Sequence, residues 1–228
     1  MSNDKVGEAL ILSLKNAVVS ATAATILGTM AGIALVRFGN FRGRMLFSGL
    51  VNAPLIMPEV ITGISSLIMF ILMAQWIGWP GSRGFTTILL AHITFSMVFV
   101  TTIVQSRMIE ADRAIEEAAM DPGSRPWQVL FDVTLPVIFP AILSGWLLAF
   151  TISLDDVVIT SFTTGPGSTT LPLLIWSKVK LGVTPDINAL ATLIVLAVGL
   201  AVALSGWIMN RAGARREADA RLAYRANA

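Results

Sequence analysis

The sequence predicts an all-α integral membrane protein, with five membrane spans in one domain of residues 1–228. Hydrophobic residues make up 55% of the chain and charged residues only 13%, which lies outside the usual range of soluble domains. Runs of 21 to 24 residues without a formal charge recur along the chain, and about 20 helical residues cross a hydrocarbon core. The lysines and arginines gather in short clusters between these runs, as expected of loops that join membrane helices.

The same composition argues against several classes of function. The chain has no cysteine, which excludes disulfides and thiol chemistry, and His92 is its one histidine, so we predict no metal site. It contains no GxxxxGK[ST], GxSxG or HExxH pattern, so we predict neither nucleotide hydrolysis nor another catalytic activity. A net charge of +2 gives no basis for nucleic-acid binding. The first fifteen residues lack the compact basic segment and apolar core of a signal peptide.

The first predicted span covers residues 16–36 and contains Gly28 and Gly32 at the GxxxG spacing. Small residues at this spacing let a second helix approach closely. We expect that second helix to belong to the same chain, although a dimer contact is the alternative. Residues 37–44 follow with three arginines and two glycines, which predicts a short cytoplasmic turn.

The second span is expected within residues 45–82, where Glu59 is the only charge. Pro54 and Pro58 predict that this span is kinked or partly broken. Trp76 and Trp79 then indicate a membrane interface before an outer loop.

The third span is residues 84–106 and the fourth is residues 133–154. For His92, in the third span, we favour a neutral, hydrogen-bonded packing histidine over a proton relay. Residues 163–186 are expected to form an outer connection that carries a half-buried helix. The fifth span is residues 187–210, and a tail with five arginines closes the chain.

The distribution of positive charge predicts the orientation. Eleven of the 16 lysines and arginines lie in residues 37–44, in the polar region from 107 to 136, and in the tail. The positive-inside rule therefore places these regions in the cytoplasm and the N-terminus outside.

Residues 110–136 form the one long polar stretch between spans. Residues 114–120 favour a helix, Pro122 and Gly123 end it, and Ser124 is expected to cap a second short helix. An apolar stripe is expected on that second helix, made by Trp127, Leu130 and Phe131 at helical spacing. An ordinary loop would not need this helix or an exposed tryptophan.

Six residues in this stretch keep a fixed spacing: Glu117, Ala118, Ala119, Gly123, Leu135 and Pro136. The spacing resembles the EAA motif of permease subunits of bacterial ABC importers, which have isoleucine where this chain has Val133. The resemblance implies a type I ABC importer transmembrane domain, with a cytoplasmic coupling helix in a loop at residues 107–136 that touches a separate ATPase. The implied coupling residues are Glu117, Ala118, Ala119, Gly123, Trp127, Leu130, Phe131, Leu135 and Pro136.

Four further segments narrow the resemblance. They are MPEVITGIS around Glu59, residues 144–162, GPGSTTLP from Gly165, and INALATL from Ile187. Together they are similar to the permeases of putrescine and spermidine importers, and closest to the putrescine type. The family usually has aspartate at position 59 and leucine at position 122. It also usually has six spans, so the first helix of the family is expected to be absent here.

That resemblance implies partners and a cellular location. The partners are a second, related permease, two ATPase subunits that hold ATP and Mg, and a periplasmic polyamine-binding protein. The chain itself is expected to bind no cofactor and to lie in the bacterial inner membrane with its C-terminus in the cytoplasm.

The carboxylates inside the spans are candidates for the substrate path. Ionisable residues at bilayer depth cost about 2.5–3.5 kcal/mol near the centre and are usually functional. Glu59, Asp155 and Asp156 could attract a cationic ammonium group. Adjacent helix positions point about 100° apart, so at most one of the two aspartates is expected to face the same substrate path as Glu59. The alternative for the Asp pair is that it caps the outer connection or pairs with Lys178 or Lys180.

We therefore predict a permease that carries a polyamine inward by alternating access. Two alternatives remain at this point: a permease for another substrate, such as an amino acid, sulfate or iron, and a stand-alone secondary transporter.

Overall fold

The computed structural model describes residues 3–111, 113–120 and 123–181, together with 188–189, 192–193, 195–196 and 199–200. Within these ranges every regular element is a helix. The predicted fifth span, apart from those eight positions, lies outside the described residues, as do Pro122 and the arginine-rich tail. The chain divides into two compact units, Met1–Trp176 and Ser177–Ala228, and the first of them contains the long helices.

Helix α1 (Asn3–Arg37) is longer at its start than the predicted span of residues 16–36. The charge-free run of residues 16–36 is preceded by Lys5, Glu8 and Lys15. Residues 3–15 nevertheless contain no proline, and they extend the helix toward the N-terminus. The Lys15 ammonium lies 5.0 Å from the centre of the Phe85 ring, a cation–π contact that accommodates its charge beside apolar residues.

The predicted break in the second span is confirmed. Helix α2 (Arg44–Ile56) contains Pro54, and Pro58 ends the interruption by serving as the N-cap of α3 (Glu59–Ile77). Proline fits this place because a residue at a helix start needs no hydrogen-bonded amide. Only α3 of the two is long enough to cross a membrane, and Glu59 is its first residue.

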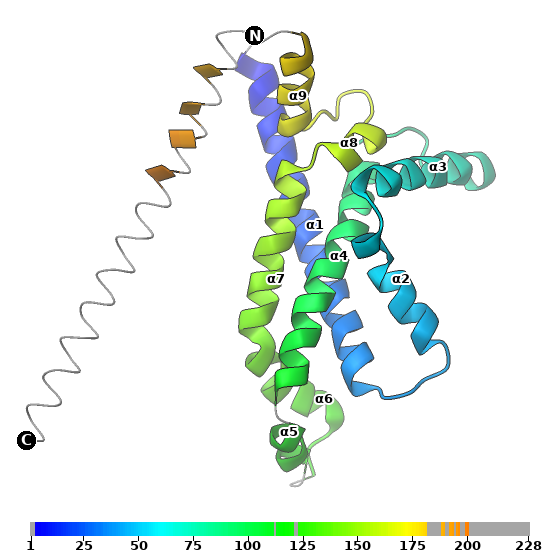
Figure 1. Cartoon of the computed structure of the whole chain (residues 1–228), viewed down its shortest axis with the longest axis vertical. Coiled ribbons are helices and arrows are strands. Elements are labelled where there is room, and N and C mark those ends of the chain that lie inside the picture. The colour runs from blue at the N-terminus through cyan, green and yellow to red at the C-terminus, as the bar shows by residue number, and fades with distance from the viewer. Residues whose placement is uncertain are drawn as a thin grey trace, which may run out of the picture. The chain divides into compact units, whose positions relative to one another are not determined.

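Three long helices, α1, α4 (Phe85–Glu110) and α7 (Leu135–Asp155), pack side by side (Figure 1). A Cβ added to Gly28 would lie 2.8 Å from the Met97 carbonyl oxygen, and one added to Gly32 would lie 2.9 Å from Val104 Cγ1. Both glycines of the GxxxG pair therefore face α4, which confirms that this motif packs helices within the chain.

The buried core of this bundle is apolar where the three helices meet. Its members are Ala21, Val100, Val104, Met108, Ile138 and Ala149. Small residues on α1 and α7 face branched residues on α4, so the helices approach closely and bury their contact faces.

The bundle has a different set of short helices at each end (Figure 1). At one end lie α5 (Arg113–Met120) and α6 (Pro126–Val129), followed by a π-helical turn, η1 (Leu130–Thr134), that runs into α7. At the other end lie α8 (Val158–Thr163) and the start of α9 (Leu171–Leu181).

Helix α8 packs against α3. Phe162 of α8 lies so close to Gly63 that a Cβ there would be 2.5 Å from its ring, and Gly165 abuts the backbone of Arg83. These contacts hold the start of α3, and with it Glu59, beside the turn that comes after α7.

Among the residues that the structure describes, four helical stretches are long and apolar enough to span a membrane: Lys5–Arg37, Glu59–Ile77, Phe85–Glu110 and Pro126–Asp155. They correspond to the first four predicted spans.

Candidate functional site

The predicted coupling loop contains the two helices and the turn between them that its sequence indicates. Gly123 lies in that turn at φ +90°, in the left-handed region, and its amide donates to the Met120 carbonyl at 3.0 Å. A side chain at this φ would be strained, which accounts for glycine at the position.

The prediction that Ser124 caps the second helix is wrong. The N-cap is Arg125, whose amide donates to Gln128 Oε1 at 2.9 Å, and Pro126 is the first helical residue. Proline at the first position and glutamine at the third position decide where this helix begins, because both favour Arg125 as the cap. The second helix therefore begins one residue later than predicted.

The predicted coupling loop exposes large apolar side chains. Trp127 is 56% exposed and Phe131 is 61% exposed, while Leu130 is half-buried. Of the three residues predicted to form an apolar stripe on one helix, Trp127 lies in α6, and Leu130 and Phe131 lie in the π-helical turn η1 that follows it. Exposed large apolar side chains of this kind are typical of surfaces at which proteins interact.

The other predicted coupling residues are distributed around this surface. Glu117 and Ala118 are exposed on α5, and Ala119 is half-buried. Leu135 is half-buried, and Pro136 is exposed at the start of α7. A cavity of about 580 Å³ lies between the end of α1 and this loop, and Glu117, Trp127 and Leu130 are among its lining residues.

The structure also shows an ion pair in this region that the sequence did not reveal. Arg37 Nε lies 2.9 Å from Glu116 Oε2, Arg37 Nη2 donates to Glu116 Oε1 at 3.1 Å, and Thr134 Oγ1 donates to Glu116 Oε1 at 3.0 Å. These three residues, the Arg37–Glu116–Thr134 cluster, join α1, α5 and η1. Nothing in the sequence distinguishes Glu116 from its neighbour Glu117 as the partner of Arg37.

The predicted path residues fall into two groups. Glu59 is exposed at the start of α3, and Asp155 is exposed as the last residue of α7. Asp156, the next residue, is half-buried and is hydrogen-bonded within the chain. Glu59 begins α3, which packs on α8, and Asp155 ends α7, with two residues between it and the start of α8.

Asp156 caps helix α8. Its carboxylate accepts hydrogen bonds from the Ile159 amide at 3.2 Å, the Thr160 amide at 2.7 Å and Thr160 Oγ1 at 2.8 Å. This geometry satisfies amides at the start of α8 that have no helical partner. The alternative considered for the Asp pair was capping of the outer connection at residues 163–186; Asp156 instead caps α8, the short helix that leads into that connection.

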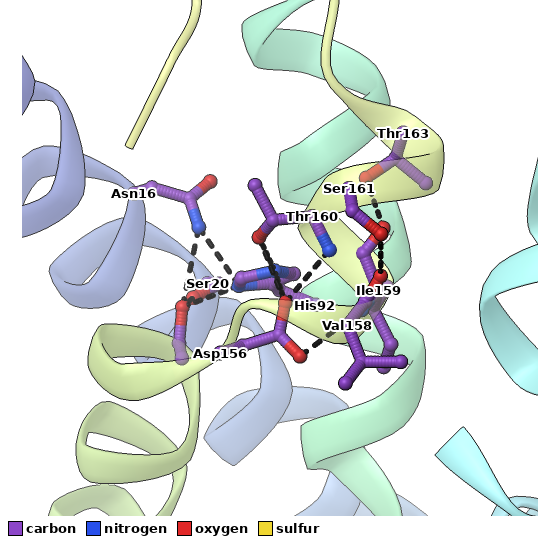
Figure 2. A network of polar contacts seen from close by, with 10 residues as sticks. Asn16, Ser20, His92, Asp156, Val158, Ile159, Thr160, Ser161 and Thr163 are labelled. Carbon is purple, nitrogen blue, oxygen red and sulfur yellow. Dashed lines mark hydrogen bonds and ion pairs between the residues drawn. The ribbon is translucent and has the colours of Figure 1, made fainter. Parts of the chain in front are cut away.

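Asp156 also belongs to a buried network that we call the polar cluster (Figure 2). Its members come from α1, α4, α7, α8 and the turn between α7 and α8, and they are Asn16, Ser20, His92, Ser153, Asp156 and Thr160. Buried polar groups are stable only when they are hydrogen-bonded, so this set holds the four helices in one arrangement.

His92 is at the centre of the polar cluster and is 2% exposed. Its Nδ1 lies 2.9 Å from Asn16 Nδ2 and 2.7 Å from Ser153 Oγ, and its Nε2 lies 3.2 Å from Asp156 Oδ2. Because a carboxylate accepts hydrogen bonds, Nε2 carries the proton that it donates to Asp156. The prediction of a hydrogen-bonded packing histidine is confirmed.

The bundle of membrane-length helices and its exposed two-helix loop fit the subunit of a membrane transporter. The chain belongs to the family of inner membrane components of binding-protein-dependent transport systems, whose model matches residues 24–217.

Among relatives, the chain is 54% identical over 225 residues to the putrescine transport system permease protein PotI of Escherichia coli K12. That match covers 99% of this chain and 80% of the relative. It is 42% identical over 211 residues to the spermidine/putrescine permease PotC of the same strain, covering 92% and 77%. The PotC protein of Haemophilus influenzae is 43% identical over 202 residues, covering 88% and 76%.

The fold is also similar to solved structures. One is the MetNI methionine ABC transporter in an inward-facing conformation, with a TM-score of 0.69 at 18% identity, covering 88% of this chain and 94% of that one. Another is an amino acid ABC transporter with histidines, with a TM-score of 0.57 at 16% identity, covering 87% and 91%.

Proposed function

We propose that this chain is the membrane-spanning permease subunit of an ATP-driven polyamine importer, with putrescine as its first candidate substrate. The observation that carries the proposal is the 54% identity to a putrescine permease over 99% of the chain. The 42% identity to a spermidine/putrescine permease supports the same class of substrate.

In the proposed arrangement the chain is a multi-pass protein of the bacterial inner membrane. The end of the bundle with α5 and α6 faces the cytoplasm, and so does the C-terminus. Arginine is abundant in residues 37–44 and in the tail, and the positive-inside rule supports this orientation.

The proposed partners are those that this role requires. A second, related permease completes the translocation path, two ATPase subunits bind ATP and Mg beneath it, and a periplasmic protein delivers the polyamine. The chain is a non-catalytic subunit and binds no cofactor. The exposed Trp127 and Phe131 suit contact with an ATPase, because large aromatic side chains dominate many protein interfaces.

Transport proceeds by alternating access. ATP-driven closure of the ATPase subunits moves the coupling loop, and the spans then switch the path from outward-facing to inward-facing. Helix α6 continues through η1 into α7 without a loop. A displacement of Trp127 is therefore transmitted along α7 toward Asp155.

The exposed carboxylates suit a cationic substrate. Glu59 begins α3, Asp155 lies at the end of α7 just before α8, which packs on α3, and both side chains are exposed. Asp156 is committed to His92 and to the start of α8. We therefore assign Glu59 and Asp155 to the substrate path and a supporting role to Asp156.

The proposal is tested by reconstituting the permease pair, the ATPase and the binding protein in liposomes and measuring putrescine uptake. We expect uptake that requires ATP inside the liposomes and loaded binding protein outside. Uptake of an amino acid or an inorganic anion in place of polyamines would indicate an importer for another substrate. Uptake by the permease without its ATPase would indicate a secondary transporter.

A further inference from the structure

We infer that the Arg37–Glu116–Thr134 cluster is the joint that passes movement of the coupling loop to α1, so that its three members are positioning residues for transport. The inference rests on the proposed function, in which an ATPase moves that loop. The coupling loop would then pass its movement to the bundle by two routes: directly along α7, and through this cluster to α1.

Burial makes this ion pair stronger than an ordinary surface pair. The side chains of Arg37 and Glu116 are 14% and 16% exposed. Partly buried charges are less screened by water, and removal of one partner leaves the other charge without compensation. By contrast, Arg107 and Glu110 form a 3.5 Å pair on a single helix with exposures of 45% and 69%, which contributes little and joins no elements.

The location of α5 depends on this contact. Helix α5 has eight residues, and helices shorter than about 12 residues are marginal without tertiary packing. From Ala114 to Met120, Glu116 and Ala119 are half-buried and the remaining residues are exposed. Packing therefore contributes little to holding α5, and the Glu116 carboxylate supplies the directional contact.

The same carboxylate also holds the junction between the coupling loop and α7. Thr134 is the last residue of η1, is 6% exposed and donates to Glu116. In this turn the Leu135 amide donates to the Leu130 carbonyl, five residues back. A π-helical turn inside a longer helix often marks a functional site, because the wider turn is less stable than regular α-helix.

Movement of α1 reaches the polar cluster. Arg37 is the last residue of α1, and Asn16 and Ser20 of the same helix bond to His92 and Ser153. Since α1 is one continuous helix, a push on Arg37 is transmitted to the elements that carry Asp155 and support α8.

The test uses the complete importer in liposomes, with putrescine uptake and ATP hydrolysis measured on the same preparation. The variants are Arg37→Gln, Glu116→Gln, Thr134→Val, and the double variant that combines Arg37→Glu with Glu116→Arg. Arg42→Gln is the matched control, because it removes an exposed positive charge five residues from Arg37. Copurification of the ATPase reports assembly.

We expect Arg37→Gln and Glu116→Gln to lower putrescine imported per ATP by about fivefold or more, the lower end of coupling between linked sites. Thr134→Val should act in the same direction with a smaller effect. The charge-swapped variant should restore the ratio, and Arg42→Gln should leave it unchanged. A charge swap that restores the ratio is not expected of a residue that only fills space.

An unchanged ratio in both single variants would overturn the inference. If Arg37→Gln and Glu116→Gln fail to assemble with the ATPase, the inference is tested by Thr134→Val and by the charge-swapped double variant. A wild-type ratio of putrescine imported per ATP in the assembled Thr134→Val importer would show that the cluster has a purely structural role. The same conclusion would follow if the charge swap restored assembly but did not restore this ratio. A wild-type importer that takes up no polyamine would instead contradict the proposed function, and this inference with it.

Discussion

Asp156 Oδ2 lies 3.2 Å from His92 Nε2, although the two residues are 64 positions apart in the sequence. His92 is part of α4, and Asp156 lies in the turn between α7 and α8. Asp156 Oδ2 also accepts a hydrogen bond from the Thr160 amide. Asp156 thus joins α4 to the start of α8, while its neighbour Asp155 is exposed. The two adjacent carboxylates have different surroundings, and we expect them to respond differently to substitution.

The first prediction compares Asp156→Asn with Asp155→Asn. Asparagine at 156 still caps α8 but loses the charged contact with His92, which costs about 1.5–3 kcal/mol for a hydrogen bond to a charged group. We expect a lower thermal midpoint for Asp156→Asn in detergent and an unchanged midpoint for Asp155→Asn. Differential scanning fluorimetry of the purified complex measures both.

The same pair should show the reverse order in transport. Asp155→Asn removes an exposed charge from the proposed path, so uptake by the stable, assembled complex should fall. Equal thermal midpoints for the two variants would contradict the assignment of Asp156 to a supporting role.

The second prediction concerns Glu59. Glu59→Gln removes the charge at the start of α3 and leaves the side chain nearly the same size. If the carboxylate contacts an ammonium group, the loss is about 1.4 kcal/mol or more, which corresponds to roughly a tenfold lower rate of uptake. We expect this decrease at saturating binding protein.

Glu59→Asp is the matched control because it keeps the charge. It should retain most of the uptake. Uptake by Glu59→Gln equal to that of the wild type would remove Glu59 from the substrate path.

Much of the fold can be predicted from the pattern of hydrophobicity and from glycine and proline. Charge-free runs located the first four spans, Pro54 and Pro58 marked the interruption between α2 and α3, and Gly28 and Gly32 indicated a close helix contact. These features are local, since each depends on the propensities of a few neighbouring residues.

The contacts between distant residues could not be predicted in the same way. The residues near Arg37 do not indicate that its partner is Glu116. In the sequence, Arg37 looks like any other arginine at the cytoplasmic end of a membrane span. The commitment of Asp156 to His92 likewise depends on how α4 and α7 pack. Long-range pairs of polar residues require the tertiary arrangement, which a single sequence does not supply.

The third prediction concerns the turn at Gly123. Its φ of +90° is unfavourable for a residue with a side chain, while no atom lies within 4 Å of an added Cβ. Gly123→Val should therefore strain the backbone by about 1–2 kcal/mol without a steric clash. We expect the turn to rearrange and ATPase copurification to decrease.

Gly123→Asn provides the comparison, because asparagine tolerates the left-handed region better than valine does. Its effect on copurification should be smaller. The same decrease in both variants would indicate that the side chain obstructs the ATPase, and the backbone explanation would then be wrong.

The fourth prediction tests the α1–α4 contact. A Cβ at Gly28 would lie 2.8 Å from both the Met97 carbonyl oxygen and Val100 Cβ, and neither atom belongs to the end of a flexible side chain. Gly28→Ala should therefore force α1 and α4 apart and destabilise the bundle by about 1–3 kcal/mol, the usual cost of overpacking. Gly7→Ala on the same helix has no atom within 4 Å of the added Cβ and should be neutral or slightly stabilising. The thermal midpoints of the two variants test this contact. A lower midpoint for Gly28→Ala alone would support the close approach of α1 and α4. Equal midpoints would mean that the two helices are further apart than in the structure.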